Sequence, residues 1–265
     1  MAHTVLVTGA SAGIGAAIAR EYAQRGWDIA LSARRREPME VLAAELREMG
    51  SRAEVFTADL FDPATPESLY GDVVNRMGQV DGLVNNAGYG HPGSYLDSPW
   101  DDHAKFLQLM LTAPSELAYL AAADMKPRGF GRIINVASLA GHLPGSRGHT
   151  LYAAVKSYLI RLSESLNAEL TGSGIHVSAL CPGFTFTEFH DVNGTREELD
   201  KLPDFMMQTA EEVAEEGVEA CERNKAVHIT GGVNKSIALL GRALPAQITR
   251  NLMASRSKKF RKDTL

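Results

Sequence analysis

Tyr152 and Lys156 stand four positions apart in the stretch "LYAAVK", which reads as the first turns of a helix. Residues at this spacing share one helix face, so a phenol and an ammonium would be neighbours. A nearby positive charge favours the phenolate and lowers a tyrosine pKa from its usual value of about 10. Such a phenol can exchange a proton with a reacting oxygen near neutral pH. The spacing alone is a weak signal, so the surrounding elements must support it.

A glycine-rich turn, "TGASAGIG", follows the first apolar run directly and opens a helix. Glycines let the backbone turn tightly and approach a bulky anion, and the amides at the helix start hold a pyrophosphate. A plain strand-to-helix turn is the alternative, but it does not need three glycines in seven positions. The turn therefore predicts a dinucleotide site with the residues Gly9, Ser11, Gly13, Ile14 and Gly15.

Three arginines, Arg34 to Arg36, follow the second apolar run. An acidic residue there would bind a ribose 2′-hydroxyl, whereas arginine favours a 2′-phosphate. A solvated helix start is the alternative, yet three cations at a helix N-terminus oppose the helix dipole. The pattern predicts NADP(H) rather than NAD(H), mainly through Arg34.

Short apolar runs alternate with longer amphipathic stretches along the whole chain. Continuous apolar runs are typical of parallel strands that are buried on both faces. The pattern predicts an α/β fold, a Rossmann-type doubly wound parallel sheet of about seven strands flanked by helices, in a single domain 1–265. The predicted strands are His3–Thr8, Asp28–Ser32, Ala53–Thr57, Gly82–Asn85, Arg132–Val136, Ile175–Leu180 and Ala226–Ile229.

Two segments break this rhythm. Residues 187–210 are largely polar with turn signals and a late apolar stretch, which predicts a substrate lid. Residues 255–265 form a basic C-terminal tail, which we interpret as solvated, with contact to a membrane surface or an acidic partner as the alternative.

Composition excludes several classes of protein. A net charge of -5 does not favour nucleic-acid partners, and no apolar stretch predicts a membrane span. Cys181 and Cys221 have no metal-ligand spacing, so we expect two buried thiols, no metal site and a reducing compartment. The start of the chain carries no targeting signal, so we expect a cytoplasmic protein.

Six motifs in order, over nearly the whole chain, identify a resemblance to the short-chain dehydrogenase/reductase family in its shorter single-domain branch. They are "TGASAGIG", "ADL" with Asp59, "NNAG" at 85–88, "NVAS" ending in Ser138, "YAAVK" and "CPGFTFT". The resemblance implies an NADP(H)-dependent oxidoreductase that interconverts a carbonyl and an alcohol, with Ser138, Tyr152 and Lys156 as catalytic residues.

The resemblance also assigns individual contacts. Tyr152 exchanges the proton, Lys156 binds the nicotinamide ribose, and Ser138 stabilises charge on the substrate oxygen. Asn85 is equally well explained as a structural turn residue, and Asp59 as a cap of the next helix. The remaining implied cofactor contacts are Asp59 and Leu60 at the adenine, Asn86, Ala87 and Gly88 at the ribose, and Pro182, Gly183, Thr185 and Thr187 at the nicotinamide.

One position departs from the family pattern. Met110 stands where family members carry an asparagine that helps to hold a water linking the lysine to solvent. A backbone carbonyl at Met110 could bind that water instead, and Met110 could also simply pack in the core. The departure keeps open an NADP(H)-binding sensor or scaffold with little turnover. An epimerase or dehydratase of the longer branch is disfavoured by the chain length and the glycine spacing.

The substrate pocket is expected at the carboxyl ends of the strands, with a largely apolar lining. A small to medium ketone, aldehyde or acyl-like carbonyl fits such a lining, and the resemblance implies a homo-oligomer built through the helices of Met110 and Tyr152. The candidate lining residues, each of which could instead be plain core, are Leu139, His142, Phe184, Phe189, Phe205 and Met206.

Overall fold

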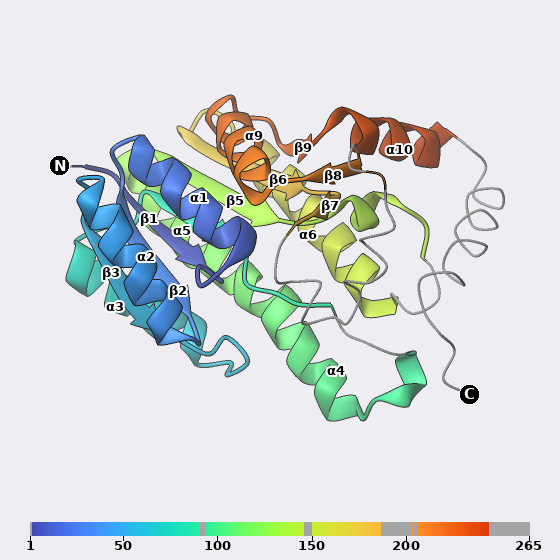
Figure 1. The fold of residues 1–265 in the computed structure, drawn as a ribbon, viewed down its shortest axis with the longest axis horizontal. Coiled ribbons are helices and arrows are strands. Elements are labelled where there is room, and N and C mark those ends of the chain that lie inside the picture. The colour runs from blue at the N-terminus through green and yellow to red at the C-terminus, as the bar shows by residue number, and fades with distance from the viewer. Residues whose placement is uncertain (1, 91–93, 146–149, 187–202, 204–205, 244–265) are drawn as a thin grey trace.

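A seven-stranded parallel sheet of order β3-β2-β1-β4-β5-β6-β9 runs through the centre of the molecule (Figure 1). The structure, a computed structural model, describes residues 2–90, 94–145, 150–186, 203 and 206–243. The strands are β1 Thr4–Thr8, β2 Asp28–Ala33, β3 Ala53–Thr57, β4 Gly82–Asn85, β5 Gly131–Val136, β6 Ile175–Cys181 and β9 Val227–Ile229. The predicted doubly wound sheet is confirmed, and each predicted strand is correct to within one residue at either end.

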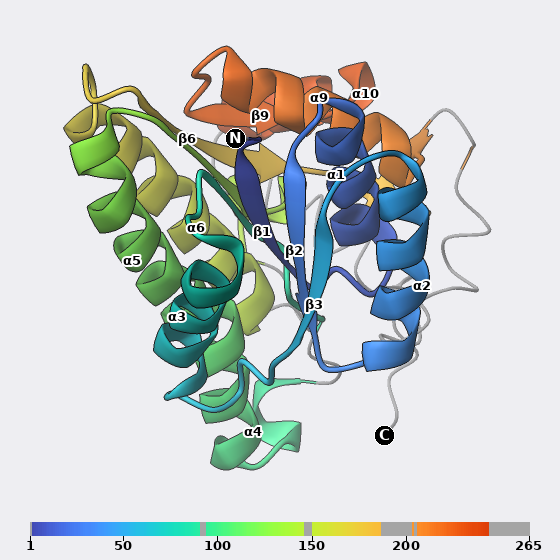
Figure 2. The ribbon, with the colours of Figure 1, turned by 90° about the vertical axis from the view of Figure 1, so that its left-hand side faces the viewer.

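Helices cover both faces of this sheet (Figure 2). The side chains of α1, α2 and α9 pack on one face and those of α3, α4, α5 and α6 on the other, so the strands are buried from both sides. This burial explains why the strands read as continuous apolar runs. The helices are α1 Gly13–Gln24, α2 Arg36–Glu48, α3 Thr65–Met77, α4 Trp100–Leu107, α5 Ala113–Arg128, α6 Thr150–Glu169, α9 Ala210–Glu222 and α10 Gly232–Ala243.

The strand order reverses between β1 and β4, at the middle of the sheet. In open α/β sheets, ligands bind outside the carboxyl ends of the strands at this reversal. The glycine turn follows β1 and the "NNAG" stretch includes the end of β4, so both motifs meet at that point.

Several short elements went unpredicted. A π-helix, η2 Gln108–Thr112, joins α4 to α5, and a small parallel sheet pairs β7 Phe184–Thr185 with β8 Met207–Gln208. The 3-10 helices η1 Tyr95–Asp97 and η3 Leu139–His142 complete the described elements.

Most of the predicted lid, residues 187–210, lies outside the described residues. Of this segment 203 and 206–210 are described, and they include β8 and the first residue of α9. The basic tail 255–265 lies outside the described residues. Of the helices that the structure describes, none has the length and apolar character needed to cross a membrane.

Candidate active site

The glycine turn is closed tightly by Asn86. The Asn86 side-chain amide donates hydrogen bonds to the carbonyls of Thr8 and Gly9 at 3.0 and 3.1 Å. A methyl group on Gly15 would collide with that amide and with the Gly9 carbonyl. Gly9 has a φ of +65°, and a methyl group there would come within 2.8 Å of the Ala87 Cα. Only glycine fits these two positions, which explains the motif.

Thr8 is a residue of this turn that sequence reasoning missed. Its hydroxyl donates to the Val84 carbonyl at 3.1 Å and accepts from the Asn86 and Ala87 amides at 3.0 and 3.1 Å. The hydroxyl therefore joins the ends of β1 and β4. The sequence did carry a signal for this role of Thr8, because a polar residue ends the apolar strand directly before the glycines.

The start of α1 fits the phosphates of a dinucleotide. Its N-cap residue is Ala12, which offers no side-chain hydrogen bond to the first amides of the helix. Such amides, together with the positive end of the helix dipole, are suited to an anion. The turn thus combines close backbone approach with available donors, so the residues present fit the cofactor that the family uses.

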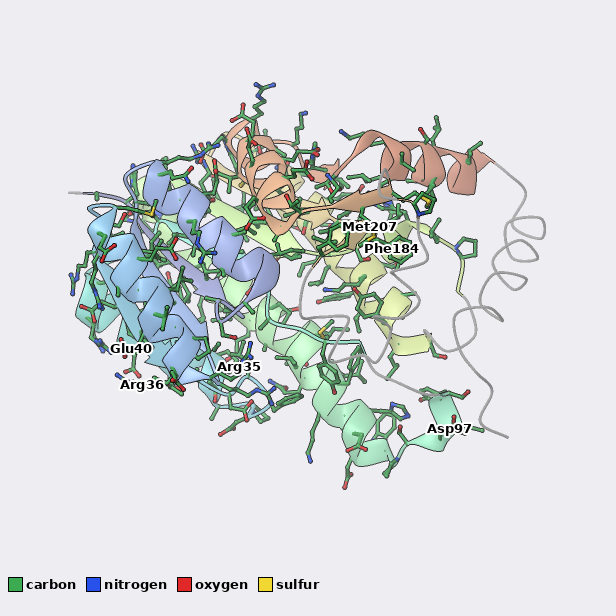
Figure 3. All side chains as sticks on the ribbon, in the orientation of Figure 1. Arg35, Arg36, Glu40, Asp97, Phe184 and Met207 are labelled. Atoms are coloured by element: carbon green, nitrogen blue, oxygen red, sulfur yellow. The ribbon has the colours of Figure 1, made fainter. Side chains whose placement is uncertain are left out.

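The three arginines after β2 have different partners, and Figure 3 labels Arg35 and the neighbouring pair Arg36 and Glu40. Arg35 donates to the Ser11 hydroxyl in the glycine turn at 3.1 Å. Arg34 lies over the Phe61 ring, 5.2 Å from its centre, and Arg36 pairs with Glu40 at 2.8 Å. Arg35, which the sequence reasoning did not single out, is therefore the arginine that contacts the glycine turn.

Asp59 and Leu60 follow β3. The Asp59 carboxylate accepts a hydrogen bond from the Phe61 amide at 3.1 Å, and Leu60 is buried. The alternative that Asp59 caps the next helix is wrong, because α3 begins at Thr65 with Ala64 as its N-cap. Asp59 instead fixes the local turn after the strand.

Ser138, Tyr152 and Lys156 come together just beyond the carboxyl end of β5. The Lys156 ammonium lies 5.6 Å from the centre of the Tyr152 ring and donates to the Val136 carbonyl at 2.7 Å. A side-chain hydrogen bond links Tyr152 to Ser138. The Ser138 hydroxyl also accepts from the Ala140 amide at 3.1 Å, which caps η3 and fixes the serine.

Burial controls the pKa values of this group. Burial raises the pKa of the Tyr152 phenol to about 12, against a smaller lowering by the hydrogen bond with Ser138. Burial also lowers the pKa of the Lys156 ammonium to about 8. The predicted lowering of the phenol pKa is therefore wrong for the chain without cofactor. The physical reason is that desolvation dominates while the ammonium is hydrogen-bonded to Val136.

Asn85 belongs to a buried polar network. Its amide donates to the Pro114 carbonyl and to Asn135 Oδ1, both at 2.9 Å. The Asn135 amide in turn donates to the Ser163 hydroxyl at 2.9 Å. The network joins β4, β5, α5 and α6, so the structural interpretation of Asn85 is supported.

Met110 is buried in the π-helix, with 1% of its surface exposed. Its sulfur lies 2.7 Å from the position that a methyl group on Gly88 would take. Met110 thus packs in the core against the "NNAG" stretch. π-Helical segments inside longer helices are frequent at functional sites because they shift the backbone hydrogen-bond pattern.

The loop after β6 closes the site. The Leu139 amide donates to the Pro182 carbonyl at 2.8 Å, which ties this loop to η3. Phe184 and Met207 lie side by side in the β7–β8 pair (Figure 3). Leu139 is buried, and His142, Phe184 and Met206 are half-buried. Thr187, Phe189 and Phe205 lie outside the described residues.

Comparisons with known proteins agree with this arrangement. A family model described as short chain dehydrogenase matches residues 3–198. Oxidoreductase UcpA of Escherichia coli (strain K12) is 36% identical over 184 residues, which cover 69% of this chain and 70% of that protein. A short-chain dehydrogenase from Sphingobium yanoikuyae in complex with NADPH is 30% identical with a TM-score of 0.80, covering 99% of this chain and 98% of that one.

A second solved structure is the bulky-bulky ketone specific alcohol dehydrogenase from Comamonas testosteroni. It is 31% identical, with a TM-score of 0.77 and 91% of each chain covered. These matches confirm the predicted resemblance. The chain therefore belongs to the short-chain dehydrogenase/reductase family and is an NAD(P)-dependent oxidoreductase of that family.

Proposed function

We propose that this enzyme interconverts a carbonyl and an alcohol with NADP(H), with Tyr152 as the acid and base. The observation that carries the proposal is the grouping of Tyr152, Lys156 and Ser138, in which Lys156 lies 5.6 Å from the tyrosine ring and Ser138 is hydrogen-bonded to the phenol. A binding protein without turnover has no chemical use for these three groups together.

Each residue has a distinct task in the proposed reaction. Bound NADP(H) supplies or accepts the hydride. Tyr152 gives a proton to the carbonyl oxygen in reduction and takes it back in oxidation. Ser138 donates a hydrogen bond to the same oxygen and stabilises its developing charge. Lys156 leaves the Val136 carbonyl to bind the nicotinamide ribose, where its charge favours the phenolate.

Two arginines and Ser11 support the preference for NADP(H). Arg35 contacts the Ser11 hydroxyl in the glycine turn, and Arg34 lies over Phe61 just after β3; these contacts support the proposal that both guanidinium groups face the adenosine ribose. Arginine suits a phosphate because its planar group presents several donors. The other proposed cofactor contacts are Gly9, Gly13, Ile14, Gly15, Asp59, Leu60, Asn86, Ala87, Gly88, Pro182, Gly183, Thr185 and Thr187.

The proton relay is proposed to use backbone in place of the missing asparagine. Met110 lies in the π-helix, where the carbonyls have a shifted set of partners. A water needs acceptors rather than a particular side chain, so a carbonyl of this segment can hold it.

We propose a small to medium ketone, aldehyde or acyl-like substrate. Leu139 directly follows Ser138, and the half-buried Phe184 and Met206 belong to the loop and the short strand region after β6, so an apolar lining at this end of the sheet supports the proposal. We also propose that the protein is a single domain and cytoplasmic. We propose that it forms a homo-oligomer through α5 and α6, since the Tyr119 side chain on α5 is 72% exposed and available for such a contact. Light scattering measures the oligomeric state.

The decisive experiment follows NADPH absorbance with a panel of carbonyl compounds for the wild type and Tyr152→Phe. We expect turnover by the wild type, and a loss of at least about a hundredfold in the variant with NADPH binding retained. NADPH binding without turnover on any compound would favour a sensor or scaffold. Turnover that persists in Tyr152→Phe would remove the tyrosine from the mechanism.

A further inference from the structure

The two-stranded sheet β7–β8 fixes the loop that follows β6. Gln208 in β8 lies opposite Thr185 in β7, and its backbone carbonyl accepts from the Phe186 amide at 3.0 Å. Pro182 and Gly183 precede β7 directly. The position of Gln208 therefore sets the position of the whole stretch 182–186.

The side-chain amide of Gln208 is bound by three other elements. Its nitrogen donates to Glu216 Oε1 on α9 at 3.1 Å. Its oxygen accepts from the Thr230 hydroxyl, just after β9, at 2.5 Å and from the Asn234 amide on α10 at 3.4 Å. Thr230 is completely buried, whereas Gln208 is half-buried, so the amide oxygen is anchored on a buried hydroxyl.

Glu216 gathers further donors around the same point. Its carboxylate accepts from His228 at 2.9 Å and from the Gly231 amide at 3.1 Å, and it lies 3.5 Å from the Lys235 ammonium. Burial raises the pKa of Glu216, but these hydrogen bonds and the Lys235 charge together lower it below its usual value. Glu216 is therefore a carboxylate at neutral pH.

Asn234 supports the loop from another side. It is 3% exposed, and its amide donates to the Thr230 carbonyl at 2.9 Å. A methyl group on Gly183 would collide with the Asn234 side chain, so the loop backbone rests directly on that amide.

We infer that Gln208, Glu216 and Asn234 are positioning residues that set the stretch 182–186 against the nicotinamide. This inference rests on the proposed function, because the contacts of Pro182, Gly183 and Thr185 with the cofactor are part of that proposal. The contacts of the three side chains are with the protein around the loop, so their proposed action is through the loop rather than through contact with cofactor or substrate. Positioning matters because a displacement of about 1 Å at a reacting group can cost about a hundredfold in rate.

The test exchanges the amide and the carboxylate of the hydrogen bond between Gln208 and Glu216. Gln208→Glu places a second carboxylate against Glu216 and removes the donor, so β8 and the loop must shift. We expect the Kd for NADPH to rise about tenfold and kcat to fall about ten- to hundredfold. The double variant Gln208→Glu, Glu216→Gln returns one amide and one carboxylate to the pair, and the new carboxylate still accepts from Thr230 and Asn234. Because Glu216→Gln also weakens the contacts of this side chain with the Gly231 amide and Lys235, we expect the double variant to recover part of the loss in Kd and kcat rather than all of it.

Glu222→Gln is the matched control. It makes the same chemical change as the Glu216→Gln half of the double variant, but at the C-terminal end of α9, and it weakens the contact with Arg132 at 2.8 Å. We expect a lower Tm with unchanged Kd and kcat. All assays are run well below the Tm of each variant, as followed by circular dichroism.

The outcomes separate the inference from the proposed function. If Gln208→Glu only lowers the Tm, as Glu222→Gln does, or if the double variant recovers neither Kd nor kcat, the positioning role is overturned. Because the Kd for NADPH is measured by fluorescence without any substrate, it decides the inference even if no carbonyl is turned over. Failure of turnover in the wild type would count against the proposed chemistry alone.

Discussion

The Lys156 ammonium lies 5.6 Å from the centre of the Tyr152 ring, but its hydrogen bond goes to the Val136 carbonyl at 2.7 Å. Lysine and tyrosine are thus neighbours without a direct bond. Burial keeps the phenol protonated, with a pKa of about 12, and brings the pKa of the ammonium down to about 8. In the chain without cofactor, Lys156 is therefore the group of this pair that titrates nearer to neutral pH.

The affinity for NADPH should consequently depend on pH. Below a pH of about 8 Lys156 is charged and can donate to the ribose hydroxyls, whereas above it the neutral amine must first take up a proton. We expect the Kd for NADPH to rise with pH above this value, by up to about tenfold per pH unit. Fluorescence titrations between about pH 7 and pH 10 measure this change.

Two variants identify the titrating group. Lys156→Gln should bind NADPH more weakly and without the rise in Kd above a pH of about 8. Tyr152→Phe should keep the rise, because the phenol titrates only near pH 12. A rise that survives in Lys156→Gln, or that vanishes in Tyr152→Phe, would show that the assignment is wrong.

The proposed preference for NADPH should depend on two of the three arginines. Arg34→Ala and Arg35→Ala each remove a cation beside the expected 2′-phosphate, and charge-assisted hydrogen bonds contribute about 1.5–3 kcal/mol. We expect the Kd for NADPH to rise about tenfold or more in each variant, with the Kd for NADH nearly unchanged. Isothermal titration calorimetry measures both nucleotides.

Arg36→Ala provides the matched control for this comparison. Arg36 is 68% exposed and pairs with Glu40, so its loss should change neither Kd. Equal wild-type affinity for NADPH and NADH would contradict the assignment, and so would an effect of Arg36→Ala as large as that of Arg35→Ala.

The buried amide network should contribute to stability more than to catalysis. Asn135→Ala leaves the Asn85 amide and the Ser163 hydroxyl without their shared partner in a site where Asn135 is completely buried. Lost hydrogen bonds and a small cavity together cost about 2–4 kcal/mol. We expect urea unfolding to show this decrease in the free energy of unfolding, with little change in the Kd for NADPH.

The same substitution at the exposed Asn75 on α3 is the control and should stay within about 0.5 kcal/mol of the wild type. If Asn135→Ala is as stable as Asn75→Ala, the buried network is not a source of stability.

The sequence predicts those features of this protein that depend on local pattern. The strands are found to within a residue because burial on both faces leaves long apolar runs, and Gly9 and Gly15 mark a turn that excludes side chains. The contact of Arg35 with Ser11 depends instead on how far one side chain reaches across the fold. The β7–β8 pair joins segments of two residues each, too short to leave a periodic pattern. The raised Tyr152 pKa depends on burial, which residue spacing cannot show.

Replacing Met110 with asparagine tests whether the relay needs a side chain. Met110 is 1% exposed and packs against Gly88, so Met110→Asn buries an amide among apolar groups and should cost about 1–3 kcal/mol of stability. If the π-helix backbone holds the relay water, as proposed, the amide adds no acceptor that the reaction requires. We therefore expect kcat and its pH profile to match those of the wild type, while the Tm falls.

Met110→Leu is the control, because it conserves volume and should keep both the Tm and kcat close to the wild type. A kcat that rises severalfold in Met110→Asn but not in Met110→Leu would show that the missing amide limits proton transfer, because only the asparagine variant supplies a new polar group at this position.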